Sequence, residues 1–181
     1  MNYIMIRTDD MLNGNGLRVV LFCTACDHCC NNCHNPETWC ASNGMKFDNE
    51  AKEIIIKELR KDYISGITFS GGDPLHENNL KDIYNLCKEI KENFPDKTIW
   101  LYTGYEWNQI FYQIVTDDLN SERDEIINYR KQIVEMCDVL VDGKFIEELA
   151  DVNYHWAGSL NQKIIDVKKS LMQNKVILYC D

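Results

Sequence analysis

Short apolar runs alternate with longer amphipathic segments along most of this chain. Four continuous apolar or β-branched stretches are typical of buried strands: residues 17–22, 66–70, 97–102 and 138–141. Between them, residues 79–93 repeat apolar side chains about every 3.6 positions, which predicts an amphipathic helix. Asp48 stands where it can cap a second helix over residues 51–59.

Weaker patterns predict several further elements. A helix is expected over residues 107–115, and the polar stretch 117–136 carries enough spaced isoleucine and valine for another. Residues 163–167 and 175–179 are predicted to be late strands. The segment Asn13-Gly14-Asn15-Gly16 precedes a strand and has no third glycine, so it predicts a turn rather than a dinucleotide fingerprint.

The order of these elements indicates an α/β fold. Strands that alternate with helices favour a parallel sheet with right-handed crossovers. A complete eightfold barrel needs about 250 residues, whereas this chain has 181. We therefore expect a single domain over residues 1–181 with an open, partial β/α barrel. Unusual motifs follow several of the strands, so the functional loops are expected at the C-terminal ends of the strands.

Composition narrows the range of partners. The chain is 45% hydrophobic and 27% charged, as in soluble globular proteins, and its formal net charge is -10. An acidic surface repels phosphate backbones and anionic membranes, so neither nucleic acid nor a membrane is expected as a partner. No apolar run approaches the roughly 20 residues that span a bilayer. Residues 1–7 also lack the features of a secretory signal, which favours a cytoplasmic location.

Five of the nine cysteines fall in one short window: Cys23, Cys26, Cys29, Cys30 and Cys33. In a reducing compartment, such a local cluster indicates metal binding or redox chemistry rather than a disulfide scaffold. The spacing Cys26-x-x-x-Cys30-x-x-Cys33 puts three thiolates on one tight loop. Three thiolates can bind three irons of a cubane cluster and leave the fourth iron open. Cys23 and Cys29 fall outside this spacing, and we expect neither to be a ligand.

A structural zinc site is an alternative interpretation of the same window. Zinc favours four cysteine or histidine ligands, and a fourth ligand is available from Cys23, Cys29, His28, His34 or Cys40. Zinc ligands more often occur as two separated pairs. The isolated cysteines are expected to be small core hydrophobes: Cys87, Cys137 and Cys180.

A glycine pair follows the strand predicted at residues 66–70, in the segment Ser70-Gly71-Gly72-Asp73-Pro74. Glycines allow a ligand to approach the backbone closely, and Asp73 offers an acceptor for an ammonium group. A plain turn that ends the strand is the alternative, because Gly, Asp and Pro are common in turns.

Three cysteines at this spacing after an early strand resemble the radical SAM superfamily. Longer segments narrow the resemblance: His34-Asn35-Pro36-Glu37-Thr38-Trp39, Leu101-Tyr102-Thr103-Gly104-Tyr105, Val141-Asp142-Gly143-Lys144-Phe145, and residues 158–167. In this order, from about residue 13 to residue 171, the chain is similar to the activating proteins of the anaerobic (class III) ribonucleotide reductase. There are departures: Ala25 replaces a usual glycine, Ala157 and Lys163 replace arginines, and Leu160 replaces a serine.

The resemblance implies a radical SAM oxidoreductase. A [4Fe–4S] cluster on Cys26, Cys30 and Cys33 would bind the amino and carboxylate groups of S-adenosylmethionine at its fourth iron. An external one-electron reductant such as flavodoxin would supply the electron that cleaves the sulfonium. The resulting 5′-deoxyadenosyl radical would take a hydrogen atom from a glycine of the reductase large subunit. The resemblance also implies the cofactor-binding residues: Asn32, Cys33, His34, Gly71, Gly72, Asp73, Thr103, Asp142 and Lys144.

Other functions remain open from the sequence. The chain could activate a different glycyl radical enzyme, such as pyruvate formate-lyase, although those activases are usually longer. A radical SAM enzyme for a small molecule would need more barrel to enclose its substrate. A zinc-stabilised binding module would have no catalytic activity at all. His34 could equally be a solvated loop histidine, and Asp142 and Lys144 a surface ion pair.

Overall fold

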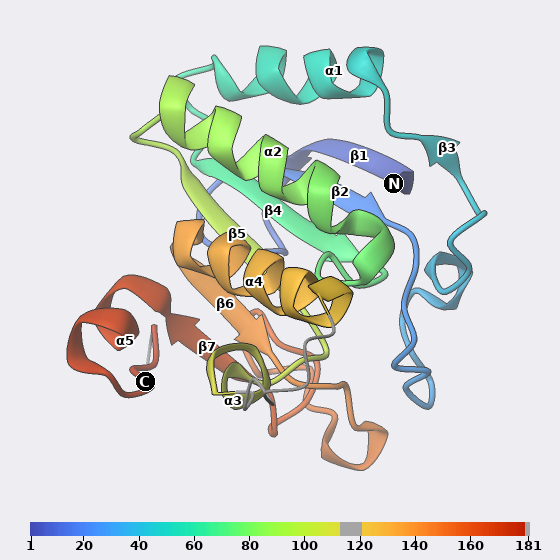
Figure 1. Cartoon of the computed structure of the whole chain (residues 1–181), viewed down its shortest axis with the longest axis vertical. Coiled ribbons are helices and arrows are strands. Elements are labelled where there is room, and N and C mark those ends of the chain that lie inside the picture. Colours follow the sequence, from blue (N-terminus) through green and yellow to red (C-terminus); the bar gives the residue numbers. More distant parts are fainter. Residues whose placement is uncertain (113–120, 180–181) are drawn as a thin grey trace.

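One seven-stranded sheet organises the computed structural model, which describes residues 1–112 and 121–179. Its strand order within these residues is β3-β1-β2-β4-β5-β6-β7 (Figure 1). The strands are β1 (Asn2–Asp10), β2 (Arg18–Cys23), β3 (Met45–Lys46), β4 (Gly66–Gly71), β5 (Thr98–Tyr102), β6 (Val139–Asp142) and β7 (Lys163–Asp166). The helices are α1 (Asn49–Leu59), α2 (Glu77–Asn93), α3 (Trp107–Phe111), α4 (Ser121–Met136) and α5 (Val167–Gln173), with short turns η1 (Pro36–Thr38) and η2 (Glu147–Leu149).

The four central strands confirm the predicted parallel arrangement. β2, β4, β5 and β6 pair in parallel, so their C-terminal ends meet at one edge of the sheet. The expectation of a wholly parallel sheet is wrong at both sides, because β1, β3 and β7 are antiparallel. These outer strands are joined to the sheet through loops rather than helical crossovers, which permits the reversed direction. The fold class is thus α/β with a mixed sheet.

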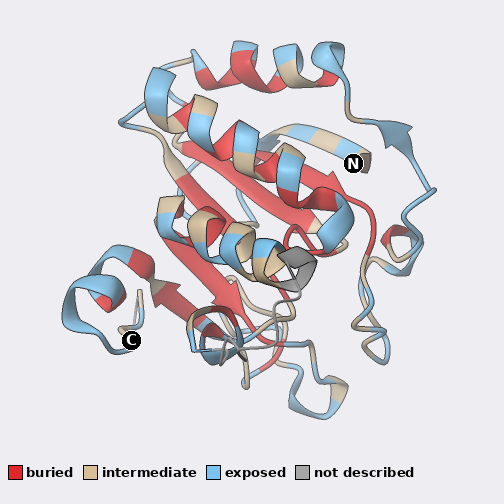
Figure 2. Cartoon of the chain, viewed as in Figure 1, coloured by how far each residue is buried: buried red, intermediate tan, exposed pale blue. Residues whose placement is uncertain are grey.

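The two faces of the sheet differ in what covers them. Side chains alternate between faces along a strand, and the odd-numbered positions of β4, for example Phe69, pack with apolar residues of α1, α2 and α4. Figure 2 shows that the central strands are buried along most of their length while the outer surfaces of these helices are exposed. The even-numbered positions, such as Ser70, Trp100 and Tyr102, point to the opposite face. There a smaller cluster joins Trp100 to Trp156.

Arg18 holds the N-terminal ends of the parallel strands together. Its side chain is fully buried and donates to Thr68 Oγ1 at 2.8 Å, to Ile67 O at 2.7 Å and to Thr98 O at 2.9 Å. Its guanidinium also lies 5.4 Å from the ring of Trp100. Burial lowers the pKa of Arg18 to about 10, so it remains charged at neutral pH. A buried charge without a carboxylate is tolerated here because backbone and hydroxyl oxygens accept its hydrogen bonds.

Local signals account for several other elements. The carboxylate of Asp48 accepts a hydrogen bond from the Ala51 N–H at 3.0 Å, which confirms the predicted cap of α1. The predicted turn at residues 13–16 is also confirmed, with a left-handed φ of 126° at Gly14 and 78° at Gly16. Cys87 and Cys137 are fully buried in the core as expected, whereas Cys180 lies outside the described residues.

Three sequence predictions need correction or restriction. The helix predicted over 107–115 ends at Phe111 as α3, and residues 113–115 lie outside the described part. The stretch 117–136 does hold a helix, α4, and its residues 117–120 likewise fall outside that part. The strand predicted at 175–179 is wrong, because this segment forms only an isolated bridge between Leu178 and Ile165.

Within the described ranges, none of the helices combines the length and the apolar character that crossing a membrane requires.

Candidate functional site

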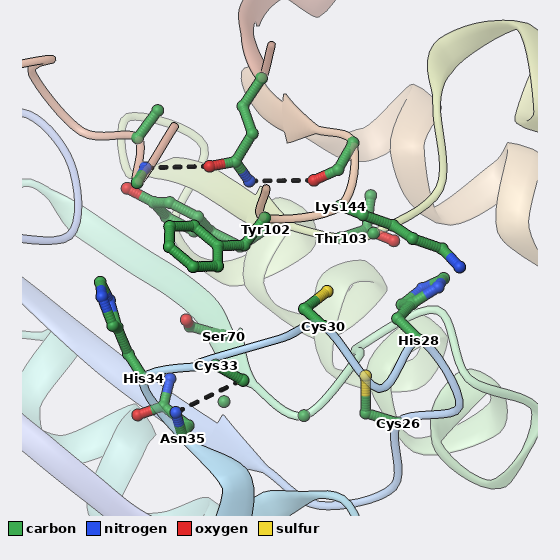
Figure 3. A pocket seen from close by; sticks show the side chains of 18 of the residues that line it. Cys26, His28, Cys30, Cys33, His34, Asn35, Ser70, Tyr102, Thr103 and Lys144 are labelled. Atoms are coloured by element: carbon green, nitrogen blue, oxygen red, sulfur yellow. Dashed lines mark hydrogen bonds between the residues drawn. The ribbon is translucent and has the colours of Figure 1, made fainter. Parts of the chain in front are cut away.

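A cavity of about 370 Å³ is formed at the C-terminal ends of the parallel strands, on the face away from α1, α2 and α4. Figure 3 shows its side chains, which come from the loop after β2, the ends of β4 and β5, and the segment after β6. Eight predicted site residues line it: Cys26, Cys30, Cys33, His34, Gly71, Gly72, Thr103 and Lys144. The other three, Asn32, Asp73 and Asp142, are not among the lining residues.

The loop after β2, residues 24–35, is called the cluster loop below. Its backbone turns tightly because Ala25, Cys29 and Asn32 have left-handed φ values of 70°, 48° and 51°. The Cys33 N–H donates to the Cys30 carbonyl at 3.2 Å, which closes the turn that separates these two cysteines. The loop therefore brings the three cysteines of the predicted triad to one side of the cavity.

The three cysteines of the predicted triad line the same cavity. In Figure 3 the sulfur atoms of Cys26 and Cys30 lie beside the cavity and are well separated from each other. The Asn35 N–H donates to Cys33 Sγ at 3.4 Å. Burial raises the pKa of Cys26 to about 12 and also raises the pKa of Cys30. A cysteine thiol binds metal only after deprotonation to the thiolate. A bound cation would therefore stabilise the thiolate form, which burial disfavours.

The donor set and one unpaired donor fit a sulfur-containing cluster. Trp39 lines the cavity, and its indole nitrogen is buried without a hydrogen-bond partner in the described part of the chain. A buried N–H normally finds an acceptor, and sulfur atoms of a cluster would provide one. Within residues 1–112 and 121–179, no three His, Cys, Asp or Glu side chains lie close enough together to hold a single metal ion.

The remaining cysteines of the window lie elsewhere. Cys23 is buried in β2, where its Sγ donates to the Ser70 carbonyl at 3.2 Å. Cys29 and Cys40 are exposed. None of the three lines the cavity, in keeping with the expectation that Cys23 and Cys29 are not ligands.

The glycine pair at the end of β4 lies against the cluster loop. A Cβ at Gly71 would come within 2.6 Å of the Cys23 carbonyl oxygen, and one at Gly72 within 2.7 Å of the Ala25 carbonyl oxygen. Gly71 also has a left-handed φ of 98°. Both glycines are thus required by the close approach of two backbone segments.

Asp73 is buried and fully engaged with neighbouring segments. Its carboxylate accepts hydrogen bonds from the Leu75 N–H at 2.8 Å, the Thr103 hydroxyl at 2.9 Å and the Gly104 N–H at 3.0 Å. His28 Nε2 lies 2.6 Å from Asp73 Oδ2. We call these five residues the Asp73 network. It joins the cluster loop to the ends of β4 and β5.

Asp142 and Asn32 also bond to the protein rather than facing the cavity. Asp142 accepts from the Trp107 N–H at 2.8 Å and the Lys163 N–H at 3.2 Å, and burial raises its pKa. The Asn32 side chain donates to Glu147, on the segment after β6. Lys144, by contrast, is exposed and lines the cavity.

Several lining residues were not singled out from the sequence, among them Ser70, Tyr102, Phe145 and Gln162. The Gln162 amide accepts from the Gly158 N–H and donates to the Gly143 carbonyl, both at 2.9 Å, and so closes this side of the cavity. His28 entered the sequence analysis only as a possible zinc ligand. The polar positions within the apolar strands, Ser70 and Tyr102, were the available signal, because they alternate with residues that face the helices.

Comparison with known proteins places these features in context. The profile of the family described as "4Fe-4S single cluster domain" matches residues 12–165. The chain is similar to anaerobic ribonucleoside-triphosphate reductase-activating proteins from Haemophilus influenzae (38% identity), Vibrio cholerae (39%) and Escherichia coli (38%). Each alignment spans 166 residues, which is 91% of this chain and 97% of the relative.

Proposed function

Because this chain belongs to the family of anaerobic ribonucleoside-triphosphate reductase-activating proteins, we propose that it installs a glycyl radical in an anaerobic ribonucleotide reductase. The observation that carries this proposal is the cysteine triad on one tight loop beside an open cavity. When bound, a [4Fe–4S] cluster with S-adenosylmethionine would supply a 5′-deoxyadenosyl radical that can take a hydrogen atom from a glycine of the reductase large subunit.

In this proposal the protein binds and orients rather than reacts. Cys26, Cys30 and Cys33 hold three irons, and no fourth cysteine lines the cavity within the described residues. One iron is thereby left for the cofactor. The cluster loop and the Gly-Gly segment enclose the reactive centre from two sides, which limits the access of water to a reactive radical.

We assign the cofactor contacts to the predicted residues that line the cavity: Cys33, His34, Gly71, Gly72, Thr103 and Lys144. Lys144 offers a cation for the carboxylate of S-adenosylmethionine at the mouth of the cavity. The other predicted residues, Asn32, Asp73 and Asp142, do not line the cavity, and in this proposal they act indirectly through the protein groups that they bond to.

We propose that the sheet is a partial β/α barrel of the radical SAM type. Four parallel strands with helices on one face and a cavity on the other support this architecture. An incomplete barrel leaves room for a substrate that is itself a protein. The large subunit of the reductase would enter from this open side, in a cytoplasmic enzyme that takes its electron from an external reductant such as flavodoxin. Neither nucleic acid nor a membrane has a part in this proposal, consistent with a net charge of -10.

Anaerobic reconstitution with iron and sulfide tests this function. The reduced protein should give the electron paramagnetic resonance (EPR) spectrum of a cubane cluster, and S-adenosylmethionine should change that spectrum. Addition of an anaerobic ribonucleotide reductase should then yield an organic radical on the reductase, whereas pyruvate formate-lyase should yield none. Purified protein that contains zinc and assembles no cubane cluster would refute the enzymatic function.

A further inference from the structure

His28 stands between two proposed ligands in the cluster loop, yet its side chain is engaged with the protein. Its ring is only 10% exposed, and Nε2 lies 2.6 Å from Asp73 Oδ2. The Asp73 side chain is 2% exposed. A histidine–carboxylate contact that is this short and this deeply buried is far stronger than one on the surface, because little water competes for it.

The carboxylate of Asp73 has little capacity left for a ligand. It already accepts from the Thr103 hydroxyl, the Gly104 N–H and the Leu75 N–H besides its contact with His28. Two oxygens offer about four acceptor positions, and these partners occupy them. Asp73 therefore influences the cavity indirectly, by fixing the positions of the groups that are hydrogen-bonded to its carboxylate.

Packing around the imidazole supports a fixed position. A Cβ on Gly104 would meet His28 Cδ2 at 2.3 Å, so a side chain at 104 would displace the ring. The His28 ring packs edge-on against Tyr105 with centroids 4.8 Å apart. Arg130 of α4 lies 4.0 Å from the Tyr105 ring and donates to its hydroxyl at 2.7 Å. The ring is thus held by contacts that extend to a helix on the far side.

We propose that His28 is a positioning residue for the proposed reaction: through the Asp73 network it fixes the cluster loop on the ends of β4 and β5. Cys26 and Cys30 lie on either side of His28, so fixing this ring fixes the spacing of two ligands before iron arrives. A loop ordered in advance loses less conformational entropy when the cluster binds. The inference rests on the proposed function only in taking this loop as the one that binds the cluster.

A second histidine–aspartate pair, whose aspartate lies in the same loop, provides a control. His76 Nε2 lies 3.0 Å from Asp27 Oδ2 and joins the loop to the start of α2, but the Asp27 side chain is 85% exposed. Exposed pairs contribute little because water and salt compete for both charges. Substitution of His76 should therefore leave the order of the cluster loop almost unchanged, although it removes a histidine–aspartate contact from the same segment.

Hydrogen exchange on the full chain without iron tests the inference directly. In H28F, which keeps a ring but loses the donor, amides of residues 24–35 should exchange roughly tenfold faster, equivalent to about 1.4 kcal/mol. H28Q, which retains a donor, should recover part of the protection, and H76F should stay within about twofold of the parent. Amides of β4 and β5 serve as the internal reference for a folded core. After reconstitution, H28F should also release iron to a chelator roughly tenfold faster.

The outcomes separate this inference from the proposed function. Unchanged protection of the loop in H28F, with loss of S-adenosylmethionine binding, would overturn the inference and make His28 a direct cofactor contact. Equal loss of protection in H28F and H76F would also overturn it, because an exposed histidine–aspartate contact to the loop would then have the same effect as the buried one. Faster exchange confined to H28F, in a chain that assembles no cluster, would support the role of His28 and refute the proposed function instead.

Discussion

Two adjacent cysteines of the cluster loop occupy different surroundings. Cys30 lines the cavity, whereas Cys29 has a left-handed backbone and an exposed side chain. We predict that Cys30→Ser abolishes both cluster assembly and cleavage of S-adenosylmethionine, because serine does not replace a thiolate as an iron ligand. Iron content, the EPR spectrum and methionine release measure these effects together.

Cys29→Ser is the matched control for this substitution. It makes the same chemical change at the neighbouring position and should retain a full complement of iron and most of the activity. A Cys30→Ser protein that still assembles a cubane cluster, or a Cys29→Ser protein that does not, would mean that the triad has been assigned to the wrong cysteine.

Ala25 carries backbone strain at the start of the same loop. Its φ of 70° is left-handed, a conformation that costs a residue with a Cβ roughly 1–2 kcal/mol. Ala51, in α1, has the same 2% exposure without that strain. Ala51→Gly should lower the free energy of unfolding by about 1–2 kcal/mol, whereas Ala25→Gly should leave it nearly unchanged.

The two alanine substitutions share the loss of a buried methyl group and the added freedom of the unfolded glycine. The difference between their changes in the free energy of unfolding, measured by chemical denaturation, therefore reports the strain at position 25. Equal destabilisation of the two variants would show that Ala25 is unstrained.

At the scale of elements, Asp138 joins α2, β5 and α5 at the start of β6. Its carboxylate accepts from Lys91 Nζ at 2.7 Å and the Ile99 N–H at 2.8 Å, and it pairs with Lys168. Burial raises the pKa of Asp138, but the hydrogen bonds from Lys168, Lys91 and Ile99 outweigh it and lower the pKa overall. The carboxylate is consequently more acidic in the folded chain than in the unfolded chain.

This shift sets the pH dependence of an Asp138→Asn variant. A lowered folded pKa stabilises the native state at pH values above the unfolded pKa of 3.8, and that stabilisation is lost as pH falls through the folded value. We predict that Asp138→Asn lowers the free energy of unfolding by about 1.5–3 kcal/mol at pH 7. The deficit should shrink as the pH falls below about 4. Denaturant titrations at several pH values measure it.

Asp96→Asn provides the control, because Asp96 lies exposed in the turn before β5. Its stability should follow that of the parent at every pH. A deficit for Asp138→Asn that does not change with pH would indicate lost packing rather than a lost ionised hydrogen-bond acceptor.

Elements with strong local signals were predictable, and those that depend on distant partners were not. The buried strands β2, β4, β5 and β6 are continuous apolar runs, which is why the sequence locates them. β1 was not predicted, because most of its positions alternate between exposed and half-buried at the side of the sheet. Residues 175–179 read as a strand, but Tyr179 instead packs on Trp100 with ring centroids 5.1 Å apart.

The candidate site likewise has features that could be predicted from the sequence and features that could not. That the three cysteines and the Gly-Gly segment lie together was predictable, because both follow parallel strands and line one cavity at the C-terminal ends of those strands. The orientation of Asp73 was not, since its partners His28 and Thr103 lie 45 and 30 residues away in sequence. The ends of β2, β4 and β5 come together only in the folded sheet. The contacts made there determine which polar side chains point into the cavity and which bond to other protein groups.

At the scale of the whole molecule, the two faces of the sheet have different roles. Helices α1, α2 and α4 cover one face and pack with the strands to form the main apolar core. The other face carries the cavity and only a small cluster around Trp100 and Trp156. The cavity lies outside the main apolar core, and we propose that the protein substrate completes its enclosure.

This arrangement predicts that the partner accelerates cleavage of the cofactor. With a low-potential reductant present, adding the reductase large subunit should raise the rate of methionine release by at least roughly tenfold, equal to about 1.4 kcal/mol of barrier. A reductase with alanine in place of its radical-bearing glycine should accelerate cleavage as well, because docking alone excludes water. Equal rates with and without either reductase would contradict closure by the partner. If only the reductase that retains its glycine accelerated cleavage, the effect would come from hydrogen transfer. That transfer consumes the 5′-deoxyadenosyl radical and so shifts the cleavage equilibrium towards products.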